Sequence, residues 1–67
     1  MNKPHNWVSN AVRVYAEGLN ECSPDWNFMG LCEGHELSEE EQYELAAAIQ
    51  AAGLPLPSED TIRRGYC

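Results

Sequence analysis

The sequence predicts an all-α protein, a compact small domain of three or four helices whose longest helix covers about residues 39–52. Apolar residues recur at helical spacing. Serine or asparagine precedes each predicted helix, and glycine lies near each predicted end. No paired alternating runs joined by a hairpin turn appear. The chain has 67 residues, of which 43% are hydrophobic, so we expect residues 1–67 to form one acidic helical domain with a small core.

The first helix is predicted from Trp7 to Leu19. Asn6 is of a type that caps a helix start, and Gly18 and Asn20 indicate its end. The apolar positions form one stripe along this helix: Trp7, Val8, Ala11, Val12, Tyr15 and Leu19.

A second, short helix is predicted to begin after Ser23, because proline and an acid follow at positions that favour a helix start. It would stop at Gly34, and Gly30 lowers its helix propensity. Its apolar residues are Trp26, Phe28, Met29, Leu31 and Cys32. We expect both tryptophans of the chain in the core. If one is exposed, we expect it to be Trp26.

The third helix has the clearest signals. Ser38 and Glu41 have the spacing of a capping box, which predicts a helix from Glu39 to Ala52. Gly53 is predicted to end it in the left-handed conformation, with Leu54 folding back onto the last turn. The expected buried stripe is Leu45, Ala48, Ile49 and Ala52, widened by Tyr43, Ala46 and Ala47.

The segment 54–57, Leu-Pro-Leu-Pro, is predicted to be a stiff linker, because proline restricts its own backbone and that of the preceding residue. Residues 58–65 then predict one or two helical turns. Acids stand at their start, bases near their end, and Gly65 follows.

Charge restricts the classes of partner. Eleven acids against four bases give a net charge of −7. This balance argues against direct binding to nucleic acid or to an anionic membrane, and it favours a partner with a basic surface. No apolar run approaches the roughly 20 residues of a membrane span, and the first residues lack the pattern of a signal peptide. With three cysteines, an odd number, we expect a cytoplasmic protein.

Metal binding and catalysis have weaker support. Cys22, Cys32 and His35 are candidate zinc ligands, with Cys67 or His5 as the fourth. Zinc sites usually pair two close ligands with two more, and Cys22 stands alone. We therefore expect no metal and no cofactor, and we expect Cys22 and Cys32 to be buried as small hydrophobic residues.

The same cysteine and histidine, Cys32 and His35, have the chemistry of a nucleophile and its base. The sequence offers no orienting acid and no glycine pattern for an oxyanion hole, and the chain is too short to enclose a usual substrate pocket. We therefore expect no catalytic residues and no enzyme.

The candidate partner-binding residues are one aromatic residue, Trp26, and six acids within twelve positions: Glu33, Glu36, Glu39, Glu40, Glu41 and Glu44. Acids in a first helical turn also interact favourably with the helix dipole. A solvated face that binds nothing therefore explains part of the same pattern.

The leading functional hypothesis is a protein-binding regulator, an inhibitor whose acidic surface blocks a basic, nucleic-acid-binding site on a larger protein. Small size and acidity are shared by phage and mobile-element inhibitors of anti-CRISPR or anti-restriction type, an analogy that no motif supports. The alternatives are a self-associating structural or assembly component, in which a second copy completes the core as a homodimer, and a small zinc-stabilised module.

Overall fold

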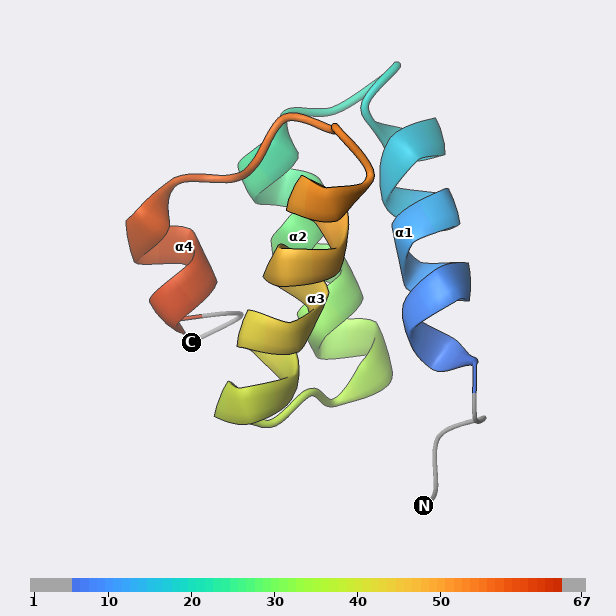
Figure 1. Ribbon diagram of the computed structural model, residues 1–67. Helices are drawn as coiled ribbons and strands as arrows, with labels where there is room; N and C mark the ends of the chain where they lie inside the picture. The colour runs from blue at the N-terminus through green and yellow to red at the C-terminus, as the bar shows by residue number, and fades with distance from the viewer. Residues whose placement is uncertain (1–5, 65–67) are drawn as a thin grey trace.

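The computed structural model describes residues 6–64, which form four helices and confirm the predicted all-α class. Helices α2 and α3 each pack against both α1 and α4, which lie on opposite sides of them (Figure 1). In chain order the helices are α1 (Trp7–Gly18), α2 (Pro24–His35), α3 (Glu39–Ala51) and α4 (Glu59–Arg64).

A single hydrophobic core lies between the helices and includes side chains from α1, α2 and α3. Burying one large apolar side chain contributes about 1.5–3 kcal/mol, so a few such residues account for much of the driving force of a small domain. The buried members are Ala11, Tyr15, Phe28, Leu31, Cys32, Leu37, Leu45, Ala46 and Ile49. Partly buried side chains pack around them: Trp7, Val12, Leu19, Leu54 and Ile62.

Helix α1 has the predicted inner face, but its start is not capped as expected. Asn6 stands at the N-cap position with φ −105° and ψ 30°, and its side chain makes no capping hydrogen bond with the described residues. At the other end, a Cβ on Gly18 would lie 1.9 Å from Oδ1 of Asn27. The Asn27 amide donates to the carbonyls of Cys22 and Ser23, at 3.1 and 2.9 Å. Gly18 therefore lets α1 and α2 approach at this corner.

Helix α2 begins as predicted and ends one residue beyond the expected Gly34. The Ser23 side chain accepts a hydrogen bond from the amide of Trp26, and His35 is the last helical residue. Glu36 then adopts the left-handed conformation, with φ 53°. Its amide donates to the Glu33 carbonyl, while the following amide, that of Leu37, donates to the Cys32 carbonyl. These two bonds form a Schellman motif, in which a glutamate occupies the position usually taken by glycine.

Replacing Glu36 with glycine is therefore expected to stabilise the fold. A residue with a Cβ costs roughly 1–2 kcal/mol in the left-handed region. Part of the gain is offset because glycine loses more backbone entropy on folding, so we expect a net gain of about 0.5–1 kcal/mol in the free energy of unfolding. Urea denaturation measures it. Glu36→Ala is the control, because alanine also carries a Cβ. Equal stability of both variants would contradict the strain argument.

Helix α3 has the predicted capping box, but its buried face is rotated from the prediction. Ser38 and Glu41 exchange both capping bonds, and Gly53, with φ 77°, ends the helix with the amide of Leu54 donating to Ile49. The buried side chains are Gln42, Leu45, Ala46 and Ile49. Three side chains expected inside are exposed instead: Tyr43, Ala47 and Ala52.

The cause of this error is that Leu45 and Ile49 belong to two possible helical stripes. Both 42-45-46-49 and 45-48-49-52 follow the spacing of one helix face. Alanine is too small and too weakly apolar to decide between them. The packing of α1 and α4 against α3 selects the first stripe, which places Gln42 inside.

The linker after α3 is tied to the helices at two points. The hydroxyl of Tyr15 donates to the Pro55 carbonyl, and the amide of Ser58 donates to Oδ1 of Asp25 at 2.6 Å. These bonds join α1 and α2 to the segment that leads into α4. Helix α4 carries the predicted acids and bases as i,i+4 ion pairs, Glu59 with Arg63 and Asp60 with Arg64. The predicted terminal glycine, Gly65, lies outside the described residues.

Candidate protein-binding surface

Helix α2 has two different faces that both contain apolar side chains. Its inward face carries Phe28, Leu31 and Cys32, which are buried in the core. Positions 26, 29, 30 and 33 follow the same i, i+3, i+4, i+7 spacing on another side of the helix. This second set, here called the outward face, consists of Trp26, Met29, Gly30 and Glu33.

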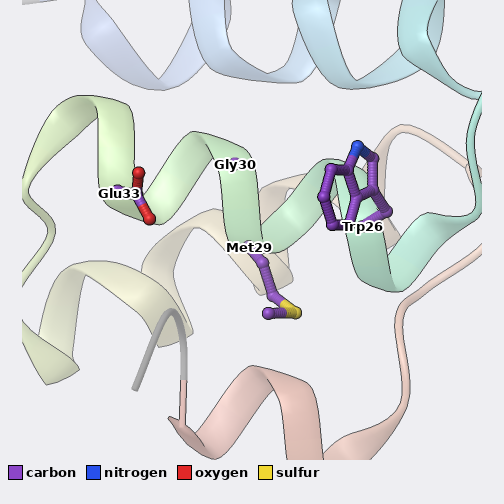
Figure 2. A pocket seen from close by; sticks show the side chains of 4 residues that line it. All are labelled: Trp26, Met29, Gly30 and Glu33. Carbon is purple, nitrogen blue, oxygen red and sulfur yellow. The ribbon is translucent and has the colours of Figure 1, made fainter.

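The outward face exposes a large apolar surface. The Trp26 side chain is 67% exposed and Met29 is 36% exposed. Together with Gly30 and Glu33 they line a shallow hollow of about 200 Å³. Figure 2 shows the indole ring of Trp26 and the carboxylate of Glu33 towards opposite ends of α2, with Met29 and Gly30 between them. An apolar floor with a carboxylate at one end suits a ligand that is both apolar and basic.

A second hollow of about 240 Å³ lies on the other side of Trp26, towards α1. Val14 of α1, which is 46% exposed, contributes to it. The hollow is lined by Val14, Cys22, Trp26, Asn27, Gly30 and Leu31. Trp26 and Gly30 line both hollows, so the indole ring projects between two concave regions. Projecting aromatic side chains beside concave surfaces are typical of the residues that dominate protein interfaces.

Two glycines on this side of α2 have no internal packing role among the described residues. A Cβ on Gly30 or Gly34 would meet no described atom within 4 Å, apart from chain neighbours and the adjacent helix backbone. A glycine inside a helix costs roughly 0.5–1 kcal/mol relative to alanine. The neighbours of Gly18 require a residue without a side chain, and those of Gly30 do not. The bare backbone at Gly30 is therefore an accessible surface.

The predicted acidic residues lie around the corner between α2 and α3. Glu33, Glu36, Glu39, Glu40 and Glu44 are exposed. Glu41 is half-buried, and its Oε1 accepts the amide of Ser38 at 2.8 Å as part of the capping box. Glu41 therefore has a structural role. Of the six predicted acids, Glu33 is also part of the hollow beside Trp26, so it links the acidic corner to the outward face.

The expectation that both tryptophans belong to the core is wrong for Trp26. Trp7 is half-buried and packs against the core, with its ring centroid 6.1 Å from that of His35. Met29 and Gly30 were not predicted as site residues. Their helical spacing from the exposed Trp26 is the signal that identifies them, once the inward face of α2 is known.

The candidate zinc ligands do not come together within residues 6–64, where no group of three or more His, Cys, Asp or Glu side chains is placed to hold a metal ion. Cys32 is buried, but Cys22 is exposed, which corrects the expectation for Cys22. Nδ1 of His35 lies 3.2 Å from the Leu31 carbonyl oxygen. The candidates for a fourth ligand, His5 and Cys67, lie outside the described residues.

The Cys32 thiol has an unusual environment. Its side chain has no exposed surface, and burial raises its pKa to about 11 because the charged thiolate is poorly solvated in the core. The thiol is thus kept protonated and covered.

The longest helix of the described segment has 13 residues, and no helix there has the length and apolar character of a membrane span. Comparisons of the chain with protein-family models, with curated proteins and with solved structures gave no significant match.

Proposed function

We propose that the chain is a protein-binding regulator and not an enzyme, and that it inhibits a larger protein by covering that protein's basic, nucleic-acid-binding surface. The observation that carries the proposal is the outward face of α2. It leaves Trp26 67% exposed in a small domain, beside a carboxylate that continues into an acidic corner. Tryptophan is among the residues that contribute most to protein–protein affinity.

Charge supports a basic partner. The net charge of −7 repels nucleic acid and attracts the surface that nucleic acid would otherwise occupy. Complementary charge of this kind mainly accelerates association and selects the partner, while the apolar contact at Trp26 slows dissociation. The acidic corner and the outward face therefore have different expected roles in binding.

Affinity purification from the source cells, or from cells that the source organism infects or inhabits, tests the proposal. The tagged chain is washed at low and at high salt, and co-purifying proteins are identified by mass spectrometry. The expected result is that one nucleic-acid-binding protein co-purifies with the chain. Its recovery should fall in the high-salt wash, because salt screens exposed charges. The purified partner should then lose nucleic-acid binding as the chain is added. Recovery of the chain alone would contradict the proposal and favour self-assembly.

Reversing three exposed acids on α3, by Glu39→Lys, Glu40→Lys and Glu44→Lys together, is expected to weaken the partner complex at least about tenfold, a loss of roughly 1.4 kcal/mol. The loss should appear mainly in the association rate and should shrink at high salt, which surface plasmon resonance measures. Helix content is checked by circular dichroism, because bases in a first helical turn interact unfavourably with the helix dipole.

The matched control reverses three exposed acids that lie elsewhere, Glu17, Glu21 and Glu59, and produces the same change in net charge. If both triple variants lose affinity equally, only net charge matters and the acidic corner is not the contact surface. If neither loses affinity, the electrostatic part of the proposal is wrong.

A further inference from the structure

We infer that the partner presents an α-helix that crosses α2 over Gly30 and Gly34 and places one arginine or lysine side chain between Trp26 and Glu33. This inference rests on the proposed function and specifies the site and the chemistry of the partner. It concerns contacts at the outward face of α2, whereas the acidic corner is expected to accelerate association with the partner.

Two glycines of α2 leave part of its backbone uncovered. Gly30 and Gly34 are four residues apart, so they lie on one side of the helix. Neither has a positive φ, and a Cβ at either would meet no described atom within 4 Å beyond the adjacent backbone. Neither the conformation nor the packing of the described chain requires a glycine there. Two glycines at this spacing leave a strip of bare backbone that a second helix can approach closely.

The hollow beside Trp26 has the chemistry of a site for a long basic side chain. Trp26 offers an aromatic face to a cation, and Glu33 offers a carboxylate towards the other end of the hollow (Figure 2). Met29 and Gly30 lie between them, where the methylene stem of a long basic side chain would be covered. Arginine fits best, because its guanidinium would pair with the Glu33 carboxylate at one end of the hollow while its methylene stem covers Met29 and Gly30 and reaches the indole of Trp26.

A second copy of the chain is not the preferred occupant of the outward face. Each copy carries a net charge of −7, and a two-fold contact through the outward face would bring the two Glu33 carboxylates into the same interface. Two of the four basic residues, Arg63 and Arg64, are already paired with acids of their own helix. A basic helix from another protein meets no such repulsion.

A displayed library of helical peptides tests the inference without knowledge of the natural partner. The peptides have an alanine-based frame randomised at four positions of one face, and they are selected for binding to the full-length chain. We expect the selected peptides to carry an arginine or lysine together with apolar residues. Their affinity should fall at least about tenfold for Trp26→Ala and for Glu33→Gln.

Gly30→Ala is the most informative variant. We expect it to raise Tm by roughly 2–8 °C, because alanine favours the helix, and yet to weaken the selected peptides at least about tenfold. A variant that is more stable but binds less cannot be explained by misfolding. Tyr43→Ala, which removes an exposed aromatic side chain of α3 that lines neither hollow, is the control and should bind normally.

Several results would overturn the inference: no helical binder, selected peptides without basic residues, or affinity unchanged by Gly30→Ala or Trp26→Ala. A dimer in sedimentation that Trp26→Ala abolishes would make a second copy the occupant. The outcome separates this inference from the proposed function. A natural partner that responds to the acid reversals and ignores the Trp26 and Gly30 variants would leave the regulator proposal standing and reject the helix contact.

Discussion

Replacing Phe28 with alanine is expected to lower the free energy of unfolding by about 3–5 kcal/mol, because it removes a large buried side chain and leaves a cavity. Phe28 is 0% exposed and is among the largest fully buried side chains of the described segment. A domain of this length has a total stability of roughly 3–10 kcal/mol. The substitution should therefore remove most of the stability, and urea denaturation followed by circular dichroism measures the loss.

Trp26→Ala is the matched control, since it truncates a larger aromatic residue on the same helix only two positions away. Because Trp26 is 67% exposed, we expect its loss to change stability by less than about 1 kcal/mol. Equal losses at the two positions would place Trp26 in the core and remove the basis of the docking proposal. A small loss at Phe28 would contradict the assignment of the inward face of α2.

The helix boundaries could be predicted because their signals are local. Ser23, Ser38 and Gly53 each act within a few residues of their own position, through the hydrogen bonds that their side chain or backbone conformation allows. The observed ends of α1, α2 and α3 each differ by one residue from the predicted ends. Gly34 met the local rule, but the chain continues to His35 and turns at Glu36, where the Schellman bonds place Leu37 in the core.

The choice of buried face depends on long-range packing, and there sequence reasoning was less accurate. On α3, alanines surround Leu45 and Ile49 on both sides, so their apolar character does not select a stripe. On α2, the inward and the outward face both carry apolar residues. The packing of α2 against α1 and α4 determines that Phe28 is inside and Trp26 outside.

Only part of the candidate site could be predicted, because the choice of the exposed face of α2 also depends on long-range packing. The exposure of the acids follows from their charge, and Trp26 was named as a binding residue. Its combination with Met29, Gly30 and Glu33 in one hollow depends on which side of α2 faces away from the core. Glu41 belongs both to the run of acids and to the capping box. A run of acids therefore does not show by itself which residues bind a partner and which stabilise the fold.

Raising the pH from 9 to 11 is expected to cost the fold about 2–3 kcal/mol through Cys32 alone. Burial raises the pKa of this thiol from 9.0 to about 11, and one pKa unit corresponds to about 1.4 kcal/mol. Between these values the unfolded chain loses the proton and the folded chain keeps it, so unfolding releases protons. Stability is therefore fully present below pH 9 and falls as the pH rises towards 11.

Tyr15 acts in the same direction at higher pH, because burial first and the nearby charge of Asp25 second raise its pKa above 10.0. Urea denaturation of the reduced protein at several values between pH 8 and 11 separates the two residues. Cys32→Ala should remove the decrease that begins near pH 9, and Tyr15→Phe should leave that part unchanged. Cys22→Ala removes an exposed thiol and serves as the control. If Cys32→Ala keeps the full pH dependence of the native chain, the thiol is not in an apolar environment and the packing of α2 against the core is wrong.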